Sequence, residues 1–433
     1  MSPQPPEFEE PDVPPIARLP LEVLSDIFLL TLPAVAPSTI WPPVVGPRWT
    51  SPWSLDQVCS QWRVLALSLS ALWTCFIIRP GMTAIELHLL AIQLERSRQA
   101  PLHLLFKCSE IPWRSQGRAY TVFLQTLVRE CHRWRTIWLE MDSVYTPIGA
   151  FKNLGPLTLL TELRLSGEYT RFIPSLDVFD HAPNLRRVIL GRKSVPHIRL
   201  PWRQITTYKA TFLHATATTH LANLSGAVAT LVECDIDIEE NNISAATLTL
   251  PRLRRLVVRE QLLDGLSAPA LRELYVASSS SAHSITGFIV RSTCALTRLT
   301  LVQCAAPAAE IVKVLRHTPA LAVLKIQFCG SPGTPNEVLV ALAGVGAGAG
   351  LAPALAALSW ADFTDSTNRA AFADMVTARW RATRRLHFVA VYTCQLRMKA
   401  SGLRLRALMS EGVDVVILRG EKGQTAIERW REY

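Results

Sequence analysis

Two stretches, I-A-R-L-P-L-E-V-L-S-D-I-F (residues 16–28) and S-L-D-Q-V-C-S-Q-W-R-V-L-A (residues 54–66), decide how the N-terminal part of this chain folds. In the first stretch, Pro20 suits the first turn of a helix, where its missing N–H costs no hydrogen bond. Leu24 and Phe28 follow four residues apart and so fall on one helical face. The first stretch therefore predicts a short amphipathic helix.

The second stretch predicts another helix. Ser54 and Gln57 have the spacing of a capping box, and apolar residues continue at steps of three and four as far as Leu69. Cys59 falls on the apolar face beside Trp62, so we expect a buried, unreactive thiol rather than a nucleophile. A unit of this size can hardly bury so many large apolar groups alone, so some of them are expected to meet a second protein.

The ordered motifs resemble an F-box: Leu19-Pro20-x-Glu22-Val23-Leu24-x-x-Ile27-Phe28, then Val58-Cys59-x-x-Trp62-Arg63, then Leu72-Trp73. F-box proteins dock on the Skp adaptor of cullin–RING ubiquitin ligases and present targets through the domain that follows. The resemblance implies these adaptor-binding residues: Leu19, Pro20, Leu21, Val23, Ile27, Phe28, Val58, Cys59, Trp62 and Leu65. The chain departs from the family in residues 33–53, a longer insert that carries Trp41, Trp49 and Trp53. An ordinary helical hairpin is the alternative interpretation.

The length of 433 residues allows two or three domains, and 49% hydrophobic residues allow a large core. Residues 1–15, rich in Pro and Glu, predict a disordered leader. Residues 16–78 form the F-box-like unit, residues 82–418 a repeat region, and residues 419–433 a polar C-terminal cap.

Cysteine usage and charge indicate the surroundings of the protein. The nine cysteines contain no C-x-x-C, and no apolar signal segment begins the chain, so a reducing compartment, cytoplasm or nucleus, is expected. The formal net charge is +10, but residues 1–30 carry six acids and one arginine, a net −5, which leaves +15 for the rest. The bulk of the molecule is therefore expected to meet an acidic partner.

A template L-x-x-L-x-L recurs through the second half of the chain and predicts internal repeats. It starts at Leu160, Leu185, Leu253, Leu271, Leu296, Leu321 and Leu355. Two blurred units are expected near residues 205–210 and 228–231. The region resembles a degenerate leucine-rich repeat solenoid, and the combination resembles F-box proteins of the fungal type. The predicted fold class is α/β: an N-terminal helical unit, then parallel strands alternating with helices and turns.

Further elements follow the same alternation of helix and strand. Val338–Ala361 is uncharged for 24 residues, but its glycines and Pro353 favour a helix to Ala343, a loop and a strand over a membrane span. The other predicted elements are helices near 85–96, 122–128 and 399–410 and strands near 102–108, 136–141, 355–360 and 413–418.

Basic residues at the x positions of the template are candidate target contacts, because strand alternation turns these positions away from the core. They are Arg186, Arg187, Arg254, Arg255, Arg272, Arg298 and Lys325. Arginine binds oxyanions through two parallel hydrogen bonds, so a row of arginines suits an acidic or phosphorylated peptide. The alternative is that these residues only keep a surface soluble.

The motifs of common enzymes and metal sites are missing from the sequence. G-x-S-x-G, the P-loop, H-E-x-x-H and G-x-G-x-x-G do not occur, and the scattered histidines, His214 and His220 included, lack cysteines at zinc spacing. No cofactor and no metal is expected. Two clusters of arginine and aromatic residues, 129–135 and 379–385, allow nucleic acid as a lesser alternative without a binding motif.

The sequence therefore predicts a non-catalytic adaptor of a Skp–cullin–F-box ubiquitin ligase. The F-box-like unit would hold the Skp adaptor, and through it the cullin, while the repeat region captures the protein to be ubiquitinated. The alternative is a leucine-rich repeat scaffold for protein interactions without a ligase, and an enzyme is a third and more distant possibility. A membrane is not expected as a partner.

Overall fold

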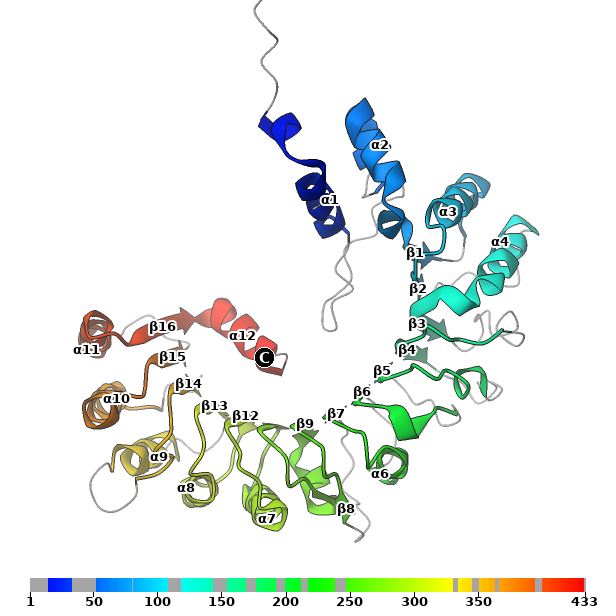
Figure 1. The fold of residues 1–433 in the computed structure, drawn as a ribbon. Helices are drawn as coiled ribbons and strands as arrows, with labels where there is room; N and C mark the ends of the chain where they lie inside the picture. Colours follow the sequence, from blue (N-terminus) through cyan, green and yellow to red (C-terminus); the bar gives the residue numbers. More distant parts are fainter. Residues whose placement is uncertain are drawn as a thin grey trace, which may run out of the picture. The chain divides into compact units, whose positions relative to one another are not determined.

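A computed structural model describes most of the chain outside the N-terminal leader and the longer loops (Figure 1). The insert after the first helix, with Trp41 and Trp49, lies outside the described part, and so does His214. The described residues are 15–32, 52–79, 81–107, 118–142, 154–168, 177–191, 199–211, 217–237, 247–329, 334–344, 350–362, 366–393 and 399–431.

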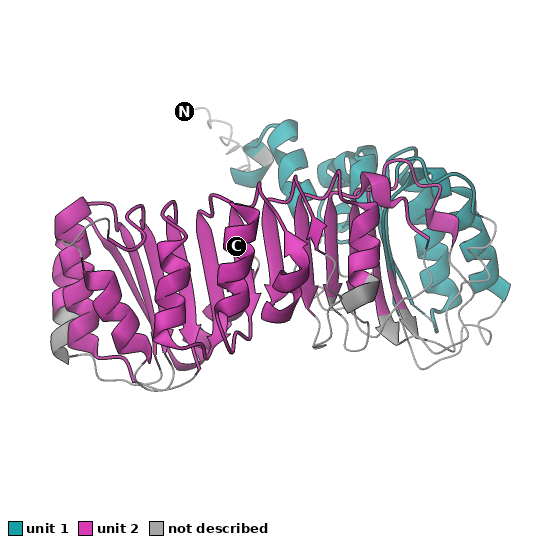
Figure 2. Cartoon of the chain, turned by 90° about the horizontal axis from the view of Figure 1, so that it is seen from below, with its two compact units in different colours: residues 1–138, 145–159 teal, residues 139–144, 160–433 magenta. Residues whose placement is uncertain are grey.

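The chain divides into two compact units, residues 1–138 with 145–159 (unit 1) and residues 139–144 with 160–433 (unit 2) (Figure 2). Each is described by itself. The elements of unit 1 are η1 (Pro15–Arg18), α1 (Leu21–Leu30), η2 (Leu55–Gln57), α2 (Ser60–Ser68), η3 (Ser70–Trp73), β1 (Cys75–Ile78), α3 (Ala84–Arg96), β2 (Leu102–Phe106), α4 (Arg118–Arg129), η5 (Cys131–Arg133) and β3 (Trp134–Asp142), whose last residues belong to unit 2. β1 and β2 pair in parallel.

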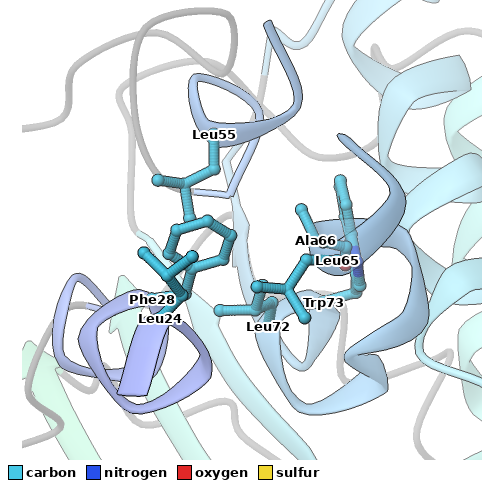
Figure 3. Packing of buried hydrophobic residues seen from close by; sticks show 7 residues of the cluster. All are labelled: Leu24, Phe28, Leu55, Leu65, Ala66, Leu72 and Trp73. Atoms are coloured by element: carbon cyan, nitrogen blue, oxygen red, sulfur yellow. Dashed lines mark hydrogen bonds between the residues drawn. The ribbon is translucent and has the colours of Figure 1, made fainter. Parts of the chain in front are cut away.

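The first two helices of unit 1 enclose a small apolar core (Figure 3). Its buried members come from α1, η2, α2 and η3: Leu24, Phe28, Leu55, Leu65, Ala66, Leu72 and Trp73. The Trp73 indole N–H donates to the carbonyl of Ala66 at 2.9 Å, so the largest residue of the core has its polar atom satisfied. Leu24, Phe28, Leu55, Leu65 and Ala66 are apolar positions of the two sequence stretches, so the apolar faces predicted there are confirmed at these positions.

The start of the second helix differs from the prediction. Ser54 makes no side-chain cap, and residues 55–57 form a 3-10 turn. α2 begins only at Ser60, with Cys59 as its N-cap. The predicted capping box is wrong, because the chain is extended at Cys59 and so interrupts the helix that the box would have started.

An ion pair ties η2 to α3 within unit 1. Asp56 is buried, and its carboxylate lies 3.2 Å from the guanidinium of Arg96. That guanidinium also lies over two indole rings, 4.4 Å from Trp73 and 4.9 Å from Trp53. Trp53, at the end of the predicted insert, thus packs edge-on against Trp73 and belongs to the core of the unit. The second half of the helical pair is therefore anchored to the helix that follows it.

Unit 2 alternates parallel strands with helices and turns. Its strands are β4 (Glu162–Glu168), β5 (Arg187–Gly191), β6 (Thr207–Thr211), β7 (Glu233–Asp237), β8 (Leu248–Thr249), β9 (Arg255–Arg259), β10 (Leu266–Ser267), β11 (Glu273–Ala277), β12 (Arg298–Cys304), β13 (Val323–Phe328), β14 (Ala357–Asp362), β15 (Phe388–Thr393) and β16 (Asp414–Arg419). Its helices are η6 (Asp177–Phe179), η7 (Trp202–Gln204), α6 (Ala217–Gly226), η8 (Glu260–Gly265), α7 (His283–Ser292), α8 (Ala308–Arg316), α9 (Thr334–Ala343), α10 (Arg369–Thr383), α11 (Lys399–Ser410), α12 (Gly420–Glu428) and η9 (Arg429–Arg431).

The sheet of unit 2 follows the order of the chain, β4-β5-β6-β7-β9-β11-β12-β13-β14-β15-β16, and neighbouring strands are parallel. β8 and β10 pair in a separate two-stranded sheet. In β9, Leu256 and Val258 are fully buried, whereas the flanking Arg255 and Arg259 are half-buried. β5, β7 and β11 show the same alternation, whereas every residue but the first of β14 and of β15 is buried. α6 to α11 cover one face of the sheet (Figure 1). We call the opposite face the inner face.

The predicted α/β class and the order of its elements are confirmed, with differences in detail. Each of the seven template sites carries a strand, and the helix to Ala343 and the last helix and strand are also present. β15 was not predicted. The second blurred unit lies slightly later than expected, at Glu233–Asp237. No helix in the described part of the chain is long and apolar enough to cross a membrane.

The C-terminal segment, α12 with η9, does not continue the repeat. It turns at Gly420, which has a positive φ of 52°. The segment lies on the inner face, whereas α6 to α11 lie on the opposite face (Figure 1). Ile427 and Trp430 are buried there against Ala361, Ala390 and Tyr392. The predicted polar cap is thus a segment with its own apolar face, folded across the sheet.

Candidate functional site

The first candidate site is the outer side of α1 in unit 1. Val23, Ile27 and Leu30 follow one another at steps of four and three residues, so they lie along one side of the helix. They are 43%, 36% and 84% exposed, whereas Leu24 and Phe28 on the other side are fully buried. α1 therefore has two apolar sides, and only one of them is used by the core of unit 1.

The approach to α2 adds more exposed apolar surface. Val58 is 59% exposed at the break between η2 and α2. Cys59 follows it, exposed, and its sulfur accepts the backbone N–H of Trp62 at 3.4 Å. The expectation of a buried Cys59 is wrong, because the late start of α2 places this residue at the helix N-terminus rather than on its apolar side.

The predicted adaptor-binding residues thus fall into two groups. Phe28 and Leu65 are buried inside unit 1, and the half-buried Trp62 packs on Phe28 with 4.8 Å between ring centroids. These three hold the helices together rather than face a partner. The remaining predicted residues are exposed or half-exposed: Leu19, Pro20, Leu21, Val23, Ile27, Val58 and Cys59. We call Leu21, Val23, Ile27, Leu30 and Val58 the apolar surface of unit 1.

The second candidate site is the inner face of unit 2. The structure divides the predicted basic residues according to their place in the repeat. Arg187, Arg255, Arg298 and Lys325 lie on strands, at positions that alternate with the core. Arg186, Arg254 and Arg272 directly precede the strands, so they are not part of the inner face. The prediction that both x positions between the first two apolar residues of the template face the inner side is wrong. The first of these two positions lies before the strand begins and so outside its alternation of faces.

Acidic residues interrupt the basic row of the inner face. Glu273 is paired in register with Arg255 on one side and Arg298 on the other. Its carboxylate lies 3.9 Å from Arg255 and 3.8 Å from Arg298. In the neighbouring row, Lys325 lies 5.8 Å from the indole ring of Trp430, and burial followed by the charge of Arg298 lowers its pKa. The row is therefore a mixed network rather than an open cluster of cations.

The strongest charged contacts of the inner face involve the C-terminal segment. Arg431 donates from Nη2 and Nε to Asp235, at 2.5 and 3.3 Å, and from Nη1 to Asp237 at 2.9 Å. Asp237 also accepts from Arg259 Nε at 2.6 Å. Arg255 in turn donates to the backbone carbonyl of Arg431. Two carboxylates on β7 thus form a fork around one guanidinium, a geometry that arginine fits better than lysine.

The electrostatics of this fork agree with its geometry. Burial raises the pKa of the Asp237 carboxyl, but Arg259 and Arg431 outweigh that effect, so the pKa of Asp237 is lowered. Burial lowers the pKa of Arg431, but Asp235 and Asp237 reverse this and raise it. Both groups therefore stay charged at neutral pH, and the contact is an ion pair under physiological conditions.

An aromatic contact accompanies the fork. Trp430, next to Arg431, is 4% exposed and packs edge-on against Tyr392 with ring centroids 5.3 Å apart. It also lines a shallow pocket with Arg255, Glu273, Tyr275, Arg298 and Thr300. Two neighbouring side chains of the C-terminal segment thus contact the inner face. The indole of Trp430 packs on apolar residues, and the guanidinium of Arg431 binds the carboxylates of β7.

Each of the two clusters that allowed nucleic acid contains one buried structural arginine. Arg133 is 3% exposed and donates to the carbonyl of Ala100 and to Ser97 Oγ, so it closes the end of α3 within unit 1. Arg379, 5% exposed, donates to the carbonyls of Leu342 and Ala352 within unit 2. One guanidinium of each cluster is thus engaged by protein groups, whereas Arg135, Arg381 and Arg385 are exposed.

Groups for metal binding are not assembled in the described residues. No cluster of three or more His, Cys, Asp or Glu residues there could hold a metal ion. His220 is fully buried and lies 3.0 Å from the Tyr208 hydroxyl, and burial lowers its pKa to about 4. This histidine therefore belongs to the core of unit 2.

Comparison of the sequence with protein-family models found no matching family. A search of curated proteins found no significant match. The function is therefore argued from the two sites themselves.

Sequence reasoning missed four residues of the inner-face site: Asp235, Asp237, Trp430 and Arg431. The alternating acids in E-C-D-I-D (233–237) were a usable signal, because alternation on a strand places them on one face. The terminal W-R pair carried no signal of its own. Its partner lies 196 residues earlier in the chain.

Proposed function

We propose that this protein is a substrate-recognition adaptor of a Skp–cullin–F-box ubiquitin ligase, without catalytic activity of its own, acting in the cytoplasm or nucleus. The observation that supports it is the apolar surface of unit 1. Four of its five residues, Leu21, Val23, Ile27 and Val58, are among those that the F-box resemblance implies for adaptor binding, yet they lie outside the core that the same motifs build. Motif residues that are apolar and exposed are the ones that a partner would bury.

The alternation along α1 carries this argument. If the motif only built a hairpin, its apolar residues would all be accounted for by the core around Leu24 and Phe28. Instead, Val23 and Ile27 are exposed beside them. Complete burial of a fully exposed side chain of this kind contributes roughly 1.5–3 kcal/mol. Val23 and Ile27, 43% and 36% exposed, would each contribute a part of this, and Leu30, 84% exposed, most of it.

The test compares aspartate substitutions at two exposed positions of unit 1. Val58→Asp introduces a charge into the apolar surface, and Ile85→Asp introduces one on α3, outside the F-box-like motifs. The two positions are 59% and 60% exposed, so the two substitutions have similar effects on folding. Binding to a purified Skp adaptor is measured by calorimetry. We expect Val58→Asp to weaken binding by at least about ten-fold, as is usual for an interface anchor, and Ile85→Asp to leave it unchanged.

Two results would contradict the proposal. If the unmodified chain binds no Skp adaptor, the ligase role fails, and a scaffold for protein interactions becomes the better interpretation. If Val58→Asp and Ile85→Asp bind equally well, the apolar surface is not the docking site. Circular dichroism of both variants checks that unit 1 remains folded.

Unit 2 is proposed as the part that captures the target. Its parallel strands in chain order, with helices on one face, support a leucine-rich-repeat-like array, although the chain carries the template in degenerate form. An acidic or phosphorylated target of the kind predicted from the sequence would meet Arg187, Arg298 and Lys325 on the inner face. Reversing Arg298 to Glu should then weaken its capture, and capture that is unchanged in high salt would contradict this choice of target.

A further inference from the structure

We infer that the fork of Asp235 and Asp237 is a binding site for arginine, and that the C-terminal Trp430-Arg431 pair is an internal ligand that a target with the same chemistry displaces. The target segment would carry an aromatic residue next to an arginine. This inference rests on the proposed role of unit 2 in target capture, and at the fork it assigns a target that carries arginine in place of the acidic target expected from the sequence.

The first argument is the geometry of the fork. Arg431 makes three hydrogen bonds to two carboxylates, from all three of its nitrogens. The carboxylates belong to consecutive outward positions of a single strand, so the strand itself holds them at the spacing that one guanidinium bridges. The site is thus built into β7 and does not depend on the C-terminal segment for its shape.

The second argument is that the ion pair of the fork is accessible from solvent. The side chain of Arg431 is 29% exposed, and that of Asp237 is 26% exposed, so water and a competing segment can reach the ion pair. α12 packs on β15 and β16, whereas the fork lies on β7, several strands away in the sheet. Release of the pair therefore costs the fork, the contact of Trp430 with Tyr392 and the hydrogen bond from Arg255, while Ile427 can keep α12 on its own strands.

The third argument is the charge on both sides of the contact. Asp235 lies beside Lys209 in register, and Asp237 is shared with Arg259. When Arg431 leaves, the two carboxylates keep Lys209 and Arg259 as neighbouring cations, but they lose the three hydrogen bonds that Arg431 donates. An arginine-bearing target can restore these bonds, whereas an acidic target has no donors for them.

The experiment uses a labelled peptide with the sequence of residues 427–433, I-E-R-W-R-E-Y, as the probe. Fluorescence anisotropy measures its binding to three forms of the full-length chain: unmodified, Arg431→Glu, and Arg431→Glu with Asp235→Asn. We expect Arg431→Glu to bind the probe at least about ten-fold more tightly than the unmodified chain, and Asp235→Asn to abolish that gain, because hydrogen bonds between charged groups carry effects of this size. Neither result involves a Skp adaptor, so failure here and failure of the ligase role are distinguishable.

Matched controls separate the fork from general electrostatics. Glu233→Gln removes an acid of the same strand that is outside the contacts described for Arg431, and it should leave probe binding unchanged. A probe with Gln in place of the arginine after Trp should fail to bind. The inference would be overturned if Glu233→Gln weakened probe binding as much as Asp235→Asn does. It would also be overturned if the chain bound an acidic phosphopeptide and this binding depended on Arg255.

A measurement on the unmodified chain covers the case in which Arg431→Glu does not fold. Hydrogen exchange is followed for residues 423–431 and for the strand β13. The inference requires the C-terminal segment to open more often than the sheet, so its amides should exchange faster than those of β13. Exchange of both at the same rate would mean that the segment leaves only when unit 2 unfolds, and the inference would be wrong.

Discussion

Replacement of Arg96 by Ala tests how the F-box-like helices are fastened within unit 1. The guanidinium lies 3.2 Å from the Asp56 carboxylate, whose side chain is 6% exposed. It also lies 4.4 Å from the ring of Trp73 and 4.9 Å from that of Trp53. The substitution therefore removes one ion pair and two cation–π contacts, and it leaves a charged carboxylate in a buried place.

The expected loss follows from these contacts. Breaking a fully buried ion pair costs about 3–5 kcal/mol, but the Arg96 side chain is 27% exposed, so the lower part of that range or less applies. Each cation–π contact adds about 0.5–1 kcal/mol at a partly exposed site. We expect Arg96→Ala to lower the free energy of unfolding of unit 1 by about 2–4 kcal/mol.

The assay is a double-mutant cycle of Arg96→Ala and Asp56→Ala. Unfolding in urea is followed by pulsed hydrogen exchange of residues 55–73, which reports on unit 1 alone. Glu95→Ala, at the exposed neighbouring position of α3, is the control and should change stability by less than about 0.5 kcal/mol. A coupling energy below about 0.5 kcal/mol, the level of additivity between independent sites, would refute the reasoning.

Three further predictions concern stability. Leu24→Ala should lower the free energy of unfolding of unit 1 by about 2–5 kcal/mol. Val23→Ala, one residue earlier on the exposed side, should lower it by less than about 1 kcal/mol. Equal losses in urea unfolding would contradict the assignment of one buried and one exposed apolar side to α1. The folded-state pKa of His220 is about 4, below the ordinary 6.5, so between these pH values the unfolded chain binds a proton that the folded chain does not. The stability of unit 2 should therefore fall as the pH drops from 6.5 toward 4, by about 2–3 kcal/mol at pH 4.5. His220→Gln should remove this pH dependence. A chain that ends at Val302 should be insoluble, because it exposes the edge of β12; a stable, soluble monomer after gel filtration would contradict the array.

The repeat pattern of the chain was readable from the sequence because its information is local. Leu256 and Val258 are buried as the template predicts, since strand alternation follows directly from residue order. β15 was missed because F-V-A-V-Y-T lacks the leucines of the template, although β-branched and aromatic residues favour a strand. Element existence was thus predictable wherever apolar spacing alone decided it.

The candidate sites were less readable, because they depend on boundaries and on distant contacts. Arg254 was assigned to the inner face because the template does not show that β9 begins one residue later. Cys59 was assigned to the core because nothing in the spacing marks the extended residue before α2. The contact of Arg431 with Asp235 joins residues 196 apart, and a window of sequence contains only one of the two.

The position of this contact in the chain has a consequence for how the protein is made. Each strand of unit 2 pairs with the one synthesised before it, so the sheet can grow in step with translation. The guanidinium that closes the fork on β7 lies 196 residues later in the chain and is synthesised after all the strands of the sheet. Until Arg431 has been made, the acidic strand therefore stands open to other arginine-bearing chains.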